Sequence, residues 1–129
     1  MAEVIQVPTS ADFLPIFEKC KAEEQFFICV ITGGNDDQGK SWCPDCVVAK
    51  PNIENIILKN ADCKVLWCNV PTRAEWVGKS DHLYKAHEEV KAKGVPTVLL
   101  YADGQIVMRA QTDEDFQNEE LLMAIAKHE

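Results

Sequence analysis

Residues 34–46, GNDDQGKSWCPDC, carry the two patterns in this chain whose residue types and spacing could do chemistry. The first eight residues match G-x-x-x-x-G-K-[ST], a loop whose backbone amides and lysine cradle phosphate groups. The last four match C-x-x-C, which serves as a redox dithiol or as half of a metal site. Because the two patterns share one loop, we expect only one of them to be the functional site.

The phosphate-binding pattern fits its surroundings poorly. Asp36 and Asp37 lie inside the would-be cradle, where two carboxylates would oppose a triphosphate. In a phosphate-binding loop the helix begins near the Lys-Ser pair, so Pro44 would fall inside that helix and remove one of its hydrogen bonds. Nucleotide binding is therefore kept only as an alternative.

The dithiol pattern explains more of its neighbours. A helix that begins at Pro44 has proline at its first position, where a missing N–H removes no helical bond. Cys43 then stands at the helix N-terminus, where free amides and the helix dipole favour the thiolate, so we expect it to be the attacking nucleophile. Cys46 lies on the apolar face of the first turn and is expected to keep its proton until it resolves a mixed disulfide.

A zinc site is a second alternative for the same cysteines. The spacing C-x₂-C-x₁₆-C-x₄-C is close to that of a zinc ribbon and is formed by Cys43, Cys46, Cys63 and Cys68. Cys63 and Cys68 are five residues apart along or just before one expected strand, which tends to aim them at opposite faces. We therefore expect no metal here, and we expect Cys20 and Cys29 to be buried packing residues.

Composition limits the class of protein. The 129 residues, 47% of them apolar, fit a single domain over 1–129 that can bury its own core. A net charge of −8 argues against partnership with nucleic acid or an anionic membrane surface. The N-terminus has neither the basic nor the apolar region of an export signal, and no apolar run approaches the roughly 18 residues of a spanning helix. We therefore expect a cytoplasmic protein.

The hydrophobic pattern predicts alternating strands and helices. Strands are expected over residues 3–7, 26–31, 64–70, 97–101 and 105–109, the last two joined by a turn at 102–104. Helices are expected up to about residue 23 and over 44–60, 80–93 and 116–127, with a kink at Pro51. This order implies an α/β fold with a mixed central sheet of about five strands and helices on both faces.

The sequence resembles the thioredoxin superfamily over nearly its whole length. The resemblance rests on Trp42-Cys43-Pro44-Asp45-Cys46, on Val95-Pro96-Thr97 and on Pro51. It implies a thioredoxin-like fold in which Pro96 is cis and packs beside the dithiol, while the backbone of Val95 pairs with substrate. Trp42 is expected to form a platform that contacts substrate beside the sulfur, and Pro44 and Asp45 are expected to help set the redox potential.

Within that superfamily, the WCPDC motif after a long acidic loop resembles a branch of small cytosolic disulfide reductases. The resemblance implies no bound cofactor, electrons from NADPH through thioredoxin reductase, and small or protein disulfides as substrates. It also implies a monomer with links to peroxide removal and a dynein light chain. The alternative is a non-catalytic adaptor that binds a signalling or motor partner. The strand at 26–31 lacks the buried aspartate that thioredoxins use to manage the proton of the resolving cysteine.

Overall fold

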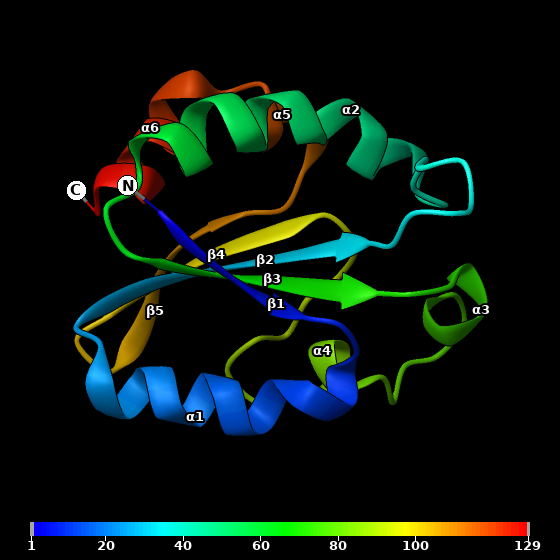
Figure 1. Ribbon diagram of the computed structural model, residues 1–129, viewed down its shortest axis with the longest axis horizontal. Helices are drawn as coiled ribbons and strands as arrows, with labels where there is room; N and C mark the ends of the chain where they lie inside the picture. The colour runs from blue at the N-terminus through cyan, green and yellow to red at the C-terminus, as the bar shows by residue number, and fades with distance from the viewer. Residues whose placement is uncertain (1, 129) are drawn as a thin grey trace.

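The computed structural model describes residues 2–128, which form one mixed sheet of five strands (Figure 1). Its order across the sheet is β1-β3-β2-β4-β5. β1, β2 and β3 are mutually parallel, whereas β4 runs antiparallel to β2 and β5 antiparallel to β4. The strands are β1 (Glu3–Val7), β2 (Phe26–Gly33), β3 (Lys64–Val70), β4 (Thr97–Ala102) and β5 (Gln105–Ala110). The mixed sheet expected from the sequence is confirmed.

Helices cover both faces of this sheet, also as expected (Figure 1). One face carries η1 (Ser10–Asp12), α1 (Phe13–Glu23), α3 (Arg73–Trp76) and α4 (Leu83–Ala86). The other carries α2 (Pro44–Asn52), its continuation η2 (Ile53–Leu58), α5 (Asp113–Phe116) and α6 (Glu119–Lys127). Among residues 2–128, no helix is both long enough and apolar enough to cross a membrane.

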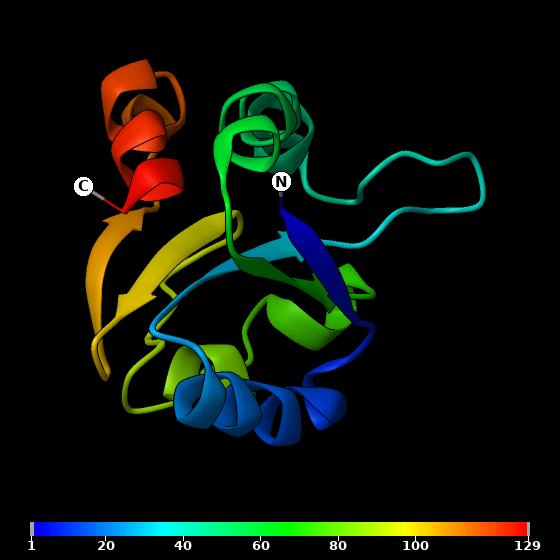
Figure 2. The same ribbon diagram turned by 60° about the vertical axis from the view of Figure 1, so that its left-hand side comes forward.

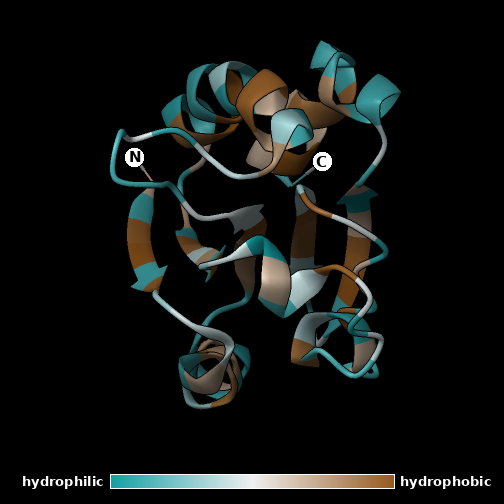
Figure 3. Cartoon of the chain, turned by 90° about the vertical axis from the view of Figure 1, so that its right-hand side faces the viewer, coloured by the Kyte–Doolittle hydropathy of each residue, from teal (hydrophilic) through white to brown (hydrophobic). Residues whose placement is uncertain are grey.

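The central strand β2 explains why the core has two halves. Successive side chains of a strand point to opposite faces, so Phe27, Cys29 and Ile31 pack on the α1 side, while Ile28 and Val30 pack on the α2 side. In Figure 3 the hydrophobic residues gather on the strands and on the helix surfaces beside them, and the outer loops are largely hydrophilic. A strand covered on both faces is expected to be apolar throughout, which matches the uninterrupted run FFICVI.

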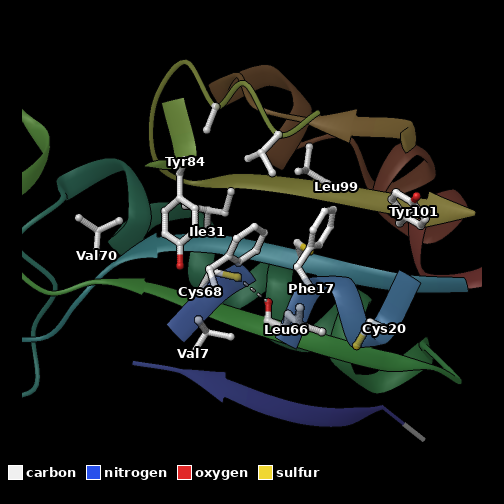
Figure 4. Close-up of a cluster of buried hydrophobic side chains, with 14 of the residues drawn as sticks. Val7, Phe17, Cys20, Ile31, Leu66, Cys68, Val70, Tyr84, Leu99 and Tyr101 are labelled. Carbon is white, nitrogen blue, oxygen red and sulfur yellow. Dashed lines mark hydrogen bonds between the residues drawn. The ribbon is translucent and has the colours of Figure 1, made fainter. Parts of the chain in front are cut away.

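The α1 half of the core contains three of the free cysteines (Figure 4). Cys20, Cys29 and Cys68 are all buried there among aromatic and aliphatic side chains. A hydrogen bond with Cys68 and complete burial raise the pKa of the Cys29 thiol well above its ordinary value. The expectation that Cys20 and Cys29 are packing residues is confirmed.

The helix after the dithiol changes character at Pro51. The sequence predicts one kinked helix over 44–60, but the α-helical hydrogen bonding ends at Asn52 and continues as a π-helix, η2. Proline has no amide hydrogen and cannot make the bond to the carbonyl four residues earlier. The wider π turn that follows keeps Ile53 and Ile57 buried against the sheet.

The helix predicted over residues 80–93 is wrong. Only one turn, Leu83–Ala86, is helical. The Nδ1 atom of His87 accepts the amides of Glu89 and Val90, and a side chain that binds nearby backbone groups competes with helix formation. The Arg109 guanidinium, from β5, donates to the carbonyls of the same two residues at 2.7 Å each. These carbonyls therefore find their partner in the tertiary structure, and the chain leaves the helical path.

The C-terminal helix is also divided. The sequence predicts a helix over 116–127, whereas Phe116 ends the short α5 and α6 begins at Glu119. Asn118 interrupts the path because its Oδ1 accepts the amide of Leu121 at 3.1 Å, which makes it the N-cap of α6.

Candidate active site

Cys43 is the N-cap residue of α2, and Pro44 occupies the first helical position. The Cys43 sulfur accepts the backbone N–H of Cys46 at 3.2 Å. A helix N-terminus offers amides without an intrahelical partner and a partial positive charge, so this sulfur takes the place that a Ser or Asp oxygen takes in an ordinary cap. The predicted start of the helix at Pro44 is confirmed.

The second partner of Cys43 comes from the segment just before β4. The Cys43 thiol donates a hydrogen bond to the Val95 carbonyl oxygen at 3.4 Å, across 52 residues of sequence. The Val95–Pro96 peptide bond is cis, as the resemblance implied. Pro96 is buried and Val95 is half-buried, so a backbone acceptor stands beside the nucleophile. Pairing of Val95 with substrate stays a prediction.

The resolving sulfur is more enclosed than the nucleophile. Cys46 is 3% exposed and accepts the Gly33 amide at 3.4 Å. Burial, together with a hydrogen bond to Cys43, raises the pKa of the Cys46 thiol to about 12. The hydrogen bonds from the Gly33 amide and from Thr32 act in the opposite direction because they favour the thiolate. The expectation that Cys46 holds its proton at rest agrees with this environment.

Gly33, at the end of β2, allows these groups to come together. A Cβ atom built on Gly33 would lie 2.8 Å from Trp42 Cε2, 2.9 Å from Cys43 Cβ and 3.1 Å from Ser41 Oγ. The Gly33 carbonyl accepts the Ser41 hydroxyl at 2.8 Å, and the same hydroxyl oxygen accepts the Cys43 amide at 3.1 Å. The Gly33 backbone therefore helps to position both cysteines, and a side chain at this residue would prevent the close approach of Trp42, Cys43 and Ser41.

Trp42 is fixed rather than free at the surface. Its indole Nε1 donates to the Val70 carbonyl at 2.8 Å, and its backbone amide donates to the Gly34 carbonyl at 3.2 Å. The side chain is half-buried and packs against the α1 half of the core. One side of the ring is thus anchored, and substrate contact by the remaining surface stays a prediction, as does redox tuning by the exposed Pro44 and Asp45.

Residues 34–41 form a loop that projects from the body of the protein (Figure 2). The Asp36 side chain accepts the amides of Gln38 at 2.8 Å and of Lys40 at 3.0 Å, and the Asp36 amide donates to the Lys40 carbonyl at 2.7 Å. A phosphate cradle needs such amides free, but here an aspartate holds them, and the helix begins only at Pro44. The geometry does not support the nucleotide-binding alternative. Between this loop and α2 is a pocket of 410 Å³ whose wall includes Thr32 and Cys46.

The four cysteines of the zinc alternative do not converge. Cys68 is buried in the α1 half of the core and Cys63 packs against the α2 half. Among residues 2–128, no three His, Cys, Asp or Glu side chains are grouped so that they could hold a metal ion. Cys43 and Cys46 therefore stand as a pair, without the other two.

Three groups at the site escaped the sequence analysis: the Thr32 hydroxyl, the Gly33 backbone and the Ser41 side chain. Gly33 belongs to a Gly-Gly pair at the end of an apolar strand, and such a pair often marks a close backbone approach. That signal could have indicated Gly33. Thr32 and Ser41 carry no signal of their own, because their roles depend on the path of the loop.

Comparison with known proteins identifies the family of the chain. A family model described as thioredoxin domain-containing protein 17-like, thioredoxin domain, matches residues 7–127. Thioredoxin domain-containing protein 17 of Mus musculus is 31% identical over 98 residues, which cover 74% of this chain and 77% of that protein. The protein of the same name from Danio rerio is 32% identical over 104 residues, 80% of each chain.

Solved structures agree on the fold. Thioredoxin from Trypanosoma brucei brucei superposes with a TM-score of 0.60 at 15% identity, covering 97% of this chain and 92% of that one. Oxidised mitochondrial thioredoxin 3 from Saccharomyces cerevisiae gives a TM-score of 0.61 at 16% identity, with coverages of 98% and 95%. The resemblance inferred from the WCPDC motif is confirmed: the chain belongs to the thioredoxin domain-containing protein 17-like family and has a thioredoxin-like fold.

Proposed function

We propose that this protein is a thiol-disulfide oxidoreductase that reduces disulfides. The observation that carries the proposal is the position of the Cys43 sulfur, capped by the Cys46 amide at the N-terminus of α2 and facing the Val95 carbonyl. Amides at a helix N-terminus stabilise a thiolate, which is the reactive form in disulfide exchange. Membership of a thioredoxin family supports the same chemistry.

The reaction proceeds in two exchanges. The Cys43 thiolate attacks one sulfur of the substrate disulfide, forms a mixed disulfide and releases the other substrate sulfur as a thiolate that takes up a proton. Cys46 then loses its proton and attacks the Cys43 sulfur, which releases the second substrate thiol and leaves a Cys43–Cys46 disulfide. Two electrons pass from the dithiol to the substrate. The Gly33 amide and the Thr32 hydroxyl contact the Cys46 sulfur, so they are placed to stabilise its thiolate as it forms.

The dithiol must be restored by an external reductant. We assign this role to NADPH acting through thioredoxin reductase, in the cytosol, with small or protein disulfides as substrates and the protein acting as a monomer. Contributions to peroxide removal and contact with a dynein light chain follow from the family resemblance and belong to the same proposal.

A coupled assay tests the proposal. With NADPH and thioredoxin reductase, the protein is expected to support NADPH oxidation in the presence of cystine or of a protein disulfide. Cys43→Ser should abolish the activity, and Cys46→Ser should accumulate a mixed disulfide detectable by mass spectrometry. Cys63→Ser is the matched control. This half-buried thiol directly precedes β3, whereas Val70, which binds Trp42, lies at the other end of that strand. The substitution should therefore leave activity unchanged. No NADPH oxidation with either substrate would contradict the reductase assignment.

The same variants separate the reductase from the adaptor alternative. An adaptor would bind its partner through a surface such as the projecting loop, and Cys43→Ser would leave that binding and its cellular effect intact. If binding and cellular effect survive in Cys43→Ser while disulfide reduction is lost, the adaptor function takes precedence.

A further inference from the structure

A basic recess is lined in part by the segment that leads into β4. Its volume is 410 Å³, and it is lined by Gly78, Lys79, Ser80, Lys85, Ala92 and Lys93. Half of these residues are lysines and none carries a carboxylate. The chain as a whole has 13 basic against 21 acidic residues, so a local concentration of amines runs against the overall charge. The lining of the recess is therefore positively charged in a protein whose net charge is negative.

The three lysines are held differently. Lys85 is already engaged, because its Nζ donates to the Trp76 carbonyl and lies 4.4 Å from the centroid of the Trp76 ring. Lys79 and Lys93 are exposed, and neither forms an ion pair within residues 2–128. The nearby Glu89 carboxylate is occupied by Lys21 at 2.7 Å. Two amines at the rim are thus available to an incoming group.

The backbone around the recess is tied together by hydrogen bonds. The Ala92 amide donates to the Tyr84 carbonyl at 2.8 Å, which joins the segment before β4 to α4. The Lys79 amide donates to the Trp76 carbonyl at 3.2 Å. The backbone on two sides of the recess, at Lys79 and at Ala92, is therefore held by hydrogen bonds.

A short stretch of chain connects the recess to the partner of the reacting sulfur. Lys93 is two residues from Val95, a separation of at most about 7 Å along the chain, and the Val95 carbonyl accepts the Cys43 thiol at 3.4 Å. In contrast, residues 36–45, which include the loop and the start of α2, carry three aspartates against one lysine. A substrate segment bound along Val95 thus meets positive charge on the side of the recess and negative charge on the side of the loop.

We propose that this recess selects disulfide substrates that carry acidic residues close to the reacting cysteine, with Lys79 and Lys93 binding their carboxylates. The inference rests on the proposed reductase function and names a substrate class for it. Lys79 and Lys93 are specificity-determining residues, and they take no part in the exchange of sulfur bonds.

The test compares two disulfide peptides of equal length, one with glutamates flanking its cysteine and one with glutamines in their place. Exposed ion pairs contribute about 0.2–1 kcal/mol, so Lys79→Gln and Lys93→Gln should each lower kcat/KM for the acidic peptide by a factor of about 1.4 to 5. The glutamine peptide should be unaffected, and the preference should fade at high salt, where such interactions are screened.

Lys59→Gln is the matched control, since it removes the same charge from an exposed site just after η2, at the far end of the sheet. Equal rates for the two peptides with the wild-type protein would overturn the inference. It would also be overturned if Lys59→Gln lowered kcat/KM for the acidic peptide as much as Lys79→Gln and Lys93→Gln do, because the preference would then depend only on the net charge of the protein.

Binding of a serine-substituted acidic peptide, measured by fluorescence anisotropy, needs no turnover. Weaker binding of the peptide to the Lys79→Gln/Lys93→Gln double variant supports the role of the recess in binding acidic substrates, even if no disulfide is reduced. Unchanged binding overturns that role and leaves the proposed reductase function unaffected.

Discussion

Replacement of Gly33 by alanine is the sharpest structural test of how the site is built. The added methyl group would lie 2.8 Å from Trp42 Cε2 and 2.9 Å from Cys43 Cβ, whereas carbon atoms attract best at about 3.5–4.0 Å. Trp42 cannot withdraw without breaking its 2.8 Å bond to the Val70 carbonyl, and Cys43 is fixed as the cap of α2. Overpacking against such fixed neighbours destabilises by about 1–3 kcal/mol.

Gly94→Ala is the matched control. A Cβ atom at Gly94 meets nothing within 4 Å, and its φ lies outside the left-handed region. Alanine there restricts the unfolded chain and is expected to stabilise by about 0.4–1 kcal/mol. Urea denaturation of the two reduced variants should therefore give unfolding free energies that differ by about 1.4–4 kcal/mol, with unchanged m-values.

Loss of activity should accompany the loss of stability in Gly33→Ala, because the same backbone positions both sulfurs. A Gly33→Ala protein as stable and as active as Gly94→Ala would refute the argument that the close approach at Gly33 is required.

Two further predictions concern the buried thiol. Burial raises the pKa of Cys46 to about 12 and that of Cys63 to about 11, against an ordinary value of 9.0. The folded protein therefore keeps protons that the unfolded chain releases above pH 9. This contribution to stability is complete below pH 9 and is lost as the pH rises from 9 to about 12. Urea midpoints of the reduced protein that do not fall above pH 9 would contradict the prediction. Thr32→Val removes a hydroxyl that favours the Cys46 thiolate, and a hydrogen bond to a charged group contributes about 1.5–3 kcal/mol, so release of the second substrate thiol should slow by about tenfold or more. Thr32→Ser should restore the rate, and an unchanged rate in Thr32→Val would show that the hydroxyl takes no part.

The sequence alone predicted the start of the helix at the dithiol and most of the sheet. Pro44 fixes where the helix begins, because proline is tolerated only in a helix's first turn, and that start makes Cys43 the cap. The unbroken apolar run FFICVI indicates a strand buried on both faces, since any polar position would face one half of the core. These features depend on residues that are close together in the chain, so the local sequence pattern is enough to predict them.

Tertiary structure decided the features that join distant segments. The Val95 carbonyl reaches Cys43 across 52 residues, and although the family resemblance implied this neighbour, no local pattern shows it. The predicted helix over 80–93 fails because Arg109, on another strand, binds carbonyls that a helix would otherwise use. The close approach at Gly33 is likewise set by where Trp42 and Ser41 return to β2. Each of these contacts joins residues that are far apart in the sequence and meet only when the chain packs. Residue types and their spacing along the chain could therefore not predict them.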